Sequence, residues 1–94
     1  MSSTISREKL EKYFFVASKA LDIAENNISK GESVYAEVIL DTARRYVSDA
    51  RHFEKKGDIV TAFAALNYAH GWLDAGARLG IFDVKDSTLF AVDN

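Results

Sequence analysis

The sequence predicts an all-α fold, an antiparallel up-down-up three-helix bundle with a C-terminal tail packed on the third helix. Three long segments carry apolar residues at the three- and four-residue spacing of an α-helix. Glycines stand where these segments end, and no proline interrupts them. Because the loops between them are short, neighbouring helices must run antiparallel. We expect a single domain, 1–94, with helices at about 7–29, 33–56 and 59–79 and a tail at 81–94.

The first helix is expected to begin after the N-cap Ser6, with Glu8 in its first turn. Its apolar residues form two rows. One row is Leu10, Phe14, Ala17, Leu21, Ala24 and Ile28, and the other is Tyr13, Val16, Ala20 and Ile23. Two rows make a stripe that is too wide for contact with one helix, so this helix should touch more than one neighbour. Lys30 and Gly31 are expected to follow its end.

The second and third helices carry small residues that predict how they pair. Each helix has three of them at heptad spacing: Ala36, Ala43 and Ala50 in the second, and Ala62, Ala69 and Gly76 in the third. An antiparallel hairpin that turns at Gly57, with Asp58 as the next N-cap, brings Ala36 opposite Gly76 and Ala50 opposite Ala62. Facing small residues let the two axes approach at the close end of the usual range, about 8 Å.

The third helix and the tail carry apolar surface that something must cover. From Ile59 to Leu73 no residue is charged, although an outer helix normally presents a charged face to solvent. The tail is also apolar, and its large residues are Ile81, Phe82, Val84, Leu89, Phe90 and Val92. We expect the tail to fold back on its own bundle. Docking of the tail on a second chain is the alternative.

The stretch Asn67–Gly80 contains the only tryptophan and three of the five glycines. On a helical wheel Trp72 falls beside the inward line, so it is expected in the core. Gly71 falls on the outer line. A glycine in the middle of a helix lowers helix stability by about 1 kcal/mol relative to alanine, so it tends to occur where another backbone comes close. We therefore expect the tail or a neighbouring helix to cross Gly71. The alternative is an interaction or ligand face on the outside of this helix. Its candidate residues are Asn67, His70, Gly71, Asp74 and Arg78.

No residue pattern indicates catalysis, a cofactor or a metal site. The sequence has no cysteine and no glycine-rich phosphate loop. Asp49 with His52, and His70 with Asp74, have the spacing of metal ligands, but the hairpin register separates the two pairs by about 15 Å. Arg45 and His52 resemble the arginine-to-histidine spacing of HEPN ribonucleases. They lie among carboxylates in a helix without net charge, which favours a salt-bridged surface.

The composition predicts the solubility of the protein, its classes of partner and its cellular compartment. With 48% hydrophobic residues, 28% charged residues and a net charge of −2, it is that of a soluble globular protein. There is no basic patch, so no nucleic-acid partner is expected. There is no signal peptide and no apolar run of membrane-spanning length, so no membrane association is expected. The absence of cysteine favours the cytoplasm.

Two segments resemble known families. "FEKKGDIVTAFAALNYA" is similar to a single tetratricopeptide-type hairpin, with Gly57 and Asp58 at the turn, but no second copy follows. "DARHFEKKGDIVTAFAALNYAHGWLDAGARLGIF", residues 49–82, resembles an archaeal family of small helical proteins, the domain of unknown function numbered three hundred and fifty-seven. The second resemblance implies an archaeal, cytoplasmic origin and an all-helical fold, and it assigns no activity.

These observations favour a non-catalytic scaffold or protein-interaction module. Its partner is expected to be a protein, which includes a second copy of the chain, bound through the third helix and the tail. The alternative is a small-molecule or nucleotide-binding domain that uses the outer face of the third helix. A HEPN-like ribonuclease ranks third.

Overall fold

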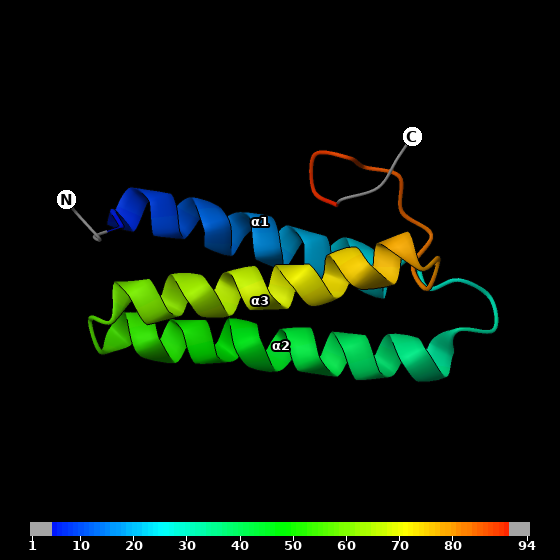
Figure 1. Cartoon of the computed structure of the whole chain (residues 1–94), viewed down its shortest axis with the longest axis horizontal. Coiled ribbons are helices and arrows are strands. Elements are labelled where there is room, and N and C mark those ends of the chain that lie inside the picture. Colours follow the sequence, from blue (N-terminus) through cyan, green and yellow to red (C-terminus); the bar gives the residue numbers. More distant parts are fainter. Residues whose placement is uncertain (1–4, 91–94) are drawn as a thin grey trace.

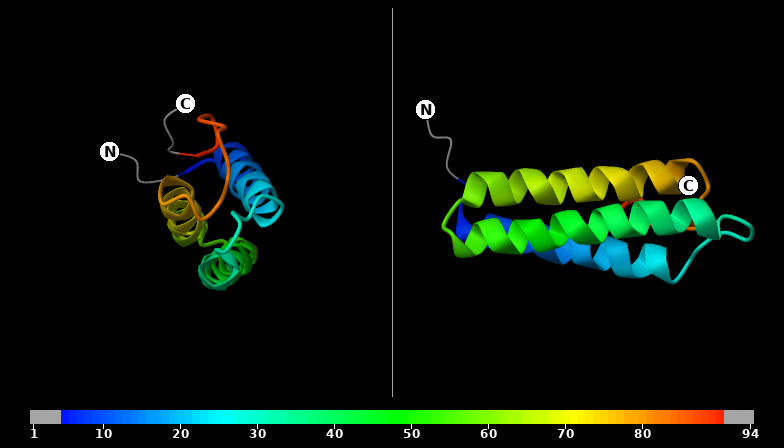
Figure 2. Two further views of the ribbon diagram at one scale, coloured as in Figure 1. Left: turned by 90° about the vertical axis from the view of Figure 1, so that its right-hand side faces the viewer. Right: turned by 90° about the horizontal axis from the view of Figure 1, so that it is seen from below.

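The computed structural model describes residues 5–90, which form three α-helices and no strand. The helices are α1 (Arg7–Glu25), α2 (Ser33–Lys55) and α3 (Ile59–Arg78). They run antiparallel to their neighbours in the chain (Figure 1), and in end view they stand at the corners of a triangle (Figure 2, left). The predicted all-α, up-down-up three-helix bundle is confirmed.

Side-chain caps begin α1 and α3, and glycines in the left-handed conformation follow the ends of α2 and α3. The Ser6 hydroxyl accepts a hydrogen bond from the Lys9 backbone N–H at 3.0 Å, as predicted for the N-cap of α1. The Asp58 carboxylate accepts from the Thr61 N–H at 3.1 Å and caps α3. Gly57, with φ of +83°, provides the left-handed turn between α2 and α3, which side chains with a Cβ rarely adopt.

Helix α1 ends at Glu25, one turn before the predicted end near residue 29. The side-chain amides of Asn26 and Asn27 donate back to the carbonyls of Asp22 and Ile23 at 2.8 and 2.7 Å. Asparagine side chains that bond to nearby backbone compete with helix continuation, and this ends the helix. Regular apolar spacing alone gave no sign of this competition.

Beyond this helix end the chain pairs with the tail. Ile28 forms an isolated antiparallel bridge with Phe82. The Ser29 N–H donates to the Ile81 carbonyl at 2.9 Å. The α1–α2 connection and the start of the tail therefore hold each other at one end of the bundle.

The packing of α2 against α3 agrees with the register that the small residues predict. All six small residues are buried, and the five alanines have no exposed surface; they are Ala36, Ala43, Ala50, Ala62, Ala69 and Gly76. Tyr46 of α2 packs edge-on against Tyr68 of α3, with ring centroids 4.5 Å apart. This contact lies where the predicted pairing places it, between the Ala43–Ala69 and Ala50–Ala62 levels.

The tail folds back on its own bundle, as expected. Ile81, Phe82 and Phe90 are buried, and Val84 and Leu89 pack half-buried against the same core. In Figure 2 (left) the tail lies over α1 and α3. Val92, which was also expected to pack, lies outside the described residues.

The Asp58 cap predicts a specific sensitivity to acid. Hydrogen bonds from the Thr61 hydroxyl and backbone N–H lower the pKa of Asp58 below its ordinary value of 3.8. When the pKa of a carboxyl is lower in the folded state than in the unfolded state, its charged form stabilises the fold at any pH above the unfolded-state pKa. That stabilisation is lost as the pH falls through the folded-state pKa. We therefore expect the free energy of unfolding, measured in urea, to decline as the pH falls below 3.8. Asp58→Asn, which keeps a capping oxygen but does not titrate, should decline less; equal declines would contradict this role.

Candidate interaction surface

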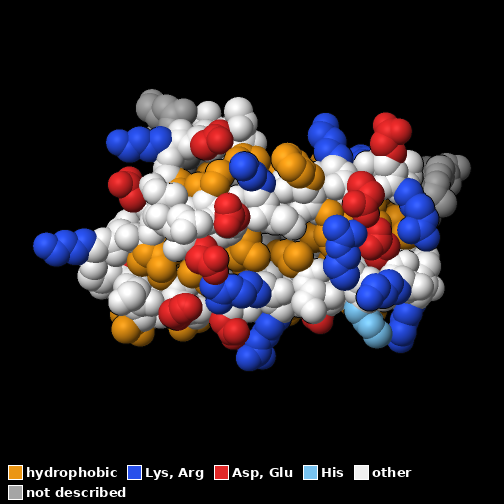
Figure 3. Space-filling view, turned by 180° about the vertical axis from the view of Figure 1, so that it is seen from behind, with side chains coloured by type: hydrophobic (Ala, Val, Ile, Leu, Met, Phe, Trp, Pro, Cys, Tyr) orange, Lys and Arg blue, Asp and Glu red, His pale blue; other side chains and the backbone are white. Residues whose placement is uncertain are grey.

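The groove between α1 and α2 is crossed by ion pairs. Arg51 donates to Glu11 at 2.9 Å, and Arg44 pairs with Glu25. The Arg51 guanidinium also lies over the Phe14 ring, 3.6 Å from its centroid. Figure 3 shows side chains of both charges over this face, with apolar atoms between them. Long charged side chains therefore cross the apolar groove and cover part of it with their stems.

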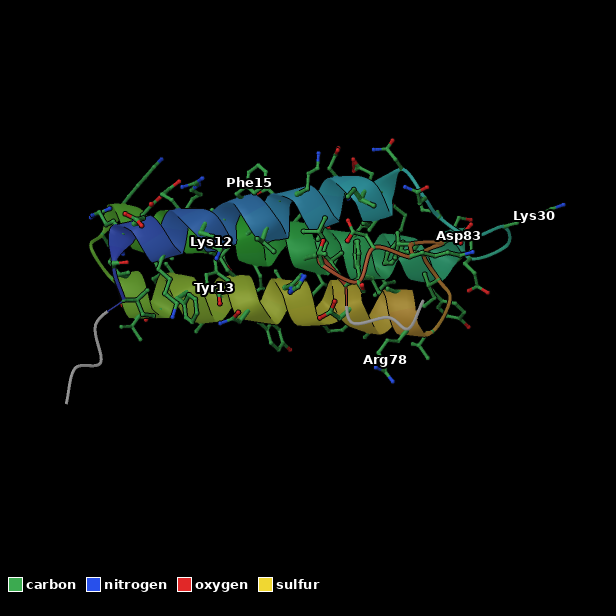
Figure 4. The ribbon with its side chains drawn as sticks, turned by 90° about the horizontal axis from the view of Figure 1, so that it is seen from above. Lys12, Tyr13, Phe15, Lys30, Arg78 and Asp83 are labelled. Atoms are coloured by element: carbon green, nitrogen blue, oxygen red, sulfur yellow. The ribbon has the colours of Figure 1, made fainter. Side chains whose placement is uncertain are left out.

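The groove between α1 and α3 is covered by aromatic rings and by the tail. Tyr13 of α1 meets Phe63 of α3 edge-on, with centroids 4.7 Å apart. Further along, the His70 Nε2–H donates to the Leu89 carbonyl at 2.5 Å and holds the tail. Figure 4 shows Tyr13 between the two helices and the tail running over them. The chain thus covers this second groove with its own residues.

Two adjacent hollows open along α3, the first in its groove with α2 and the second on the surface of α3 alone. The first has a volume of 370 Å³ and is lined by Tyr46, Asp49 and Phe53 of α2 and by Thr61, Ala64, Ala65 and Tyr68 of α3. The second has a volume of 420 Å³ and is lined by Asn67, Tyr68, Gly71, Trp72 and Ala75. Tyr68 belongs to both hollows. Among the described residues that line them, Asp49 alone is charged.

Large apolar side chains extend this surface toward the end of the bundle that holds the tail. Tyr35 and Val38 of α2 are 65% and 57% exposed, and Leu79 after α3 is 74% exposed. Helical periodicity places all three on the side where α2 and α3 meet. Tyr68, in the middle, is 51% exposed. We call the two hollows and these side chains together the α2–α3 face. It lies away from the tail, which passes on the other side of the bundle (Figure 2).

The five residues of the predicted outer face separate into three sets. Asn67 and Gly71 line the second hollow. His70 turns toward the tail, and its Nε2 lies 3.9 Å from Asp74 Oδ1, with 27% and 25% of the two side chains exposed. Arg78, in the last turn of α3, points away from the bundle (Figure 4). The structure thus brings together two pairs, and the joint binding role of all five stays a prediction.

One prediction for this stretch is wrong and another is confirmed in part. Neither the tail nor a helix crosses Gly71, because a Cβ added there would meet nothing within 4 Å. The tail crosses Gly76 instead, where a Cβ would lie 2.5 Å from the Phe82 ring. Trp72 packs against the main core cluster, as predicted, but its side chain is half-buried rather than fully buried. It also lines the second hollow, and its ring lies edge-on to Tyr68 with the ring centroids 6.4 Å apart.

The open position of Gly71 makes a simple prediction. Gly71→Ala is expected to raise the free energy of unfolding by about 0.5–1 kcal/mol, because alanine restricts the unfolded chain and nothing opposes its methyl group. Urea denaturation followed by circular dichroism measures the change. A decrease in the free energy of unfolding would contradict this, because it would mean that the added methyl group disturbs a contact at Gly71.

Sequence reasoning missed most of the α2–α3 face. The charge-free run from Ile59 to Leu73 indicated an uncovered side of α3 but did not say which neighbour it adjoins. A further signal was available in α2. Tyr35, Tyr46 and Phe53 recur at a spacing that keeps them on one side of a helix, next to the small residues that face α3.

The described part of the chain has neither membrane-spanning nor metal-binding features of the usual kinds. None of the helices within residues 5–90 has the length and apolar character needed to cross a bilayer. In the same residues no three side chains of the metal-ligating types are grouped to hold an ion.

One comparison with known proteins gives a match. A family model described as a protein of unknown function (DUF357) matches residues 12–82. The matched region starts in α1, includes all of α2 and α3, and ends at the tail residue that packs on Gly76. No curated protein and no solved structure matches the chain.

Proposed function

The chain belongs to the DUF357 family, whose description names no activity, and from its surface we propose that it is a non-catalytic protein-interaction module. One observation carries this proposal. Ion pairs cross the α1–α2 groove, and aromatic rings together with the tail cover the α1–α3 groove, but the apolar α2–α3 face is left open.

The residue types of the α2–α3 face suit protein binding. Tyrosine and tryptophan are enriched at the centres of interfaces, where their rings bury a large apolar area and their polar atoms still find partners. Tyr68 and Trp72 stand at the centre of the face, beside hollows that can receive side chains of a partner. Charged residues are depleted from interface cores, and the lining of both hollows holds only Asp49 among the described residues.

The proposal revises the predicted route of binding. The tail packs on its own bundle, so it supports the module rather than meeting the partner. Asn67 and Gly71 remain part of the proposed surface, since they line the second hollow. The proposal includes the archaeal, cytoplasmic setting that the sequence led us to expect, and a protein or a second copy as the partner.

Site-specific photocrosslinking tests the proposal. A photoreactive phenylalanine analogue replaces Tyr68 on the α2–α3 face, and in a control it replaces Phe15, which is 69% exposed on α1. Irradiation of native cells is expected to give a discrete crosslinked protein from position 68 and none from position 15. No adduct at position 68, or the same adducts from both positions, would overturn the proposal.

A further inference from the structure

We infer that the partner on the α2–α3 face is a basic amphipathic α-helix that lies along the groove and adds a fourth helix to the bundle. This inference rests on the proposed function and specifies its partner. It depends on the spacing of the two hollows and on the position of Asp49.

The spacing of the hollows fits a helix. Along α3 the first hollow is lined by residues between Thr61 and Tyr68, and the second by residues between Asn67 and Ala75. The midpoints of these two segments are about seven residues apart, or roughly 10 Å at the helical rise. Two turns of a docked helix advance by about 11 Å. Large apolar side chains at positions i and i+7 would therefore enter the two hollows together when the helix lies nearly parallel to α3.

The charge at the first hollow selects a basic helix. Asp49 lines this hollow among aromatic and alanine side chains. Arg45, one turn earlier in α2, pairs with Asp41 at 3.1 Å, whereas the described residues give Asp49 no ion-pair partner. A docked helix would remove water from this carboxylate, and burying an unpaired charge is costly. A lysine or arginine beside the apolar stripe of the partner would pair with Asp49 and offset that cost.

A second copy of the chain fits this face less well. If two copies met through this face, the only charged residue among the described ones that line the hollows would again be Asp49, so neither set of linings would offer a cation to the other carboxylate. Helix side chains project outward and can fill such hollows.

A model peptide tests the inference directly. The probe is a fluorescein-labelled helical peptide of about 18 residues, five turns, made of leucine along one face and lysine elsewhere. A second peptide carries glutamate in place of lysine. We expect fluorescence anisotropy to show binding of the lysine peptide and at least about tenfold weaker binding of the glutamate peptide. Asp49→Lys should reverse this preference.

Two matched variants locate the binding. Ala64→Trp fills the first hollow and is expected to weaken binding of the lysine peptide at least about tenfold. Ser18→Trp adds the same side chain to an exposed position of α1 and should leave binding unchanged. Circular dichroism checks that both variants keep the helical content of the wild type.

The possible failures are distinguishable. Equal binding of both peptides, or equal weakening by Ala64→Trp and Ser18→Trp, would overturn the helix-in-groove inference. So would light scattering that shows a dimer of the chain alone which Ala64→Trp dissociates, because the occupant would then be a second copy. If no peptide binds but position 68 still crosslinks to a protein, the inference fails and the proposed function stands. If position 68 gives no crosslink either, both fail.

Discussion

Phe82→Ala is expected to lower the free energy of unfolding by about 3–5 kcal/mol, the usual cost of removing a fully buried phenylalanine. Phe82 is 1% exposed and sits where the tail meets α3, beside Gly76. Its backbone also forms the bridge with Ile28, so loss of the ring leaves a cavity at the point that anchors the tail. Urea denaturation gives the change in stability.

Proteolysis gives a second measurement of the same effect. Lys85 is exposed in the tail, and trypsin should cleave after it more readily once the tail is loosened in Phe82→Ala. Leu79→Ala is the control, because this leucine is 74% exposed and its loss should change stability by no more than about 0.5 kcal/mol. A loss below about 1 kcal/mol in Phe82→Ala would show that the tail contributes little to the core.

Gly76→Ala is expected to lower the free energy of unfolding by about 1–3 kcal/mol, the range for overpacking a close contact. The added Cβ would lie 2.5 Å from Phe82 Cε2 and 3.2 Å from Ile39 Cδ1. Since a ring and a core side chain must both move, the usual gain from replacing a helical glycine is outweighed. Gly71→Ala, in the same helix and without a neighbour, is the matched control and should have the opposite sign.

A double variant separates the clash from other causes. If the Phe82 ring is what opposes the methyl group, Gly76→Ala should cost much less in the Phe82→Ala background than in the wild type. Strict additivity of the two losses would mean that the destabilisation by Gly76→Ala has another origin.

The three helices and their pairing could be predicted because they depend on local and periodic features. Capping residues such as Ser6 and Asp58 mark the helix starts, and Gly57 marks the hairpin turn. Small residues at heptad spacing set the register, and their burial agrees with it. The early end of α1 at Glu25 escaped prediction because asparagine side chains compete for its backbone, and apolar spacing does not report that competition.

The candidate site could be predicted only in part because it depends on where non-local segments pass. A helical wheel gives the direction of a side chain but not the path of the tail, so Gly71 was chosen as the crossing point instead of Gly76. Trp72 packs against the core but also lines the second hollow, and whether that flank is filled depends on the neighbouring side chains. The same limit hid Asp49, whose place in the first hollow requires α2 and α3 to be set side by side.

The bridge between Ile28 and Phe82 has a consequence for the order of folding. The most extensive helix contact joins α2 and α3, which are neighbours in the chain, and this favours early formation of their hairpin. The bridge joins segments separated by more than half of the chain, so it closes a large loop and should form last. The Ser29 and Asp83 amides, which bond to Ile81 and Asn27, should then exchange hydrogen together and faster than those of central α3. The tail would thus open and close as its own cooperative unit on a bundle that stays folded.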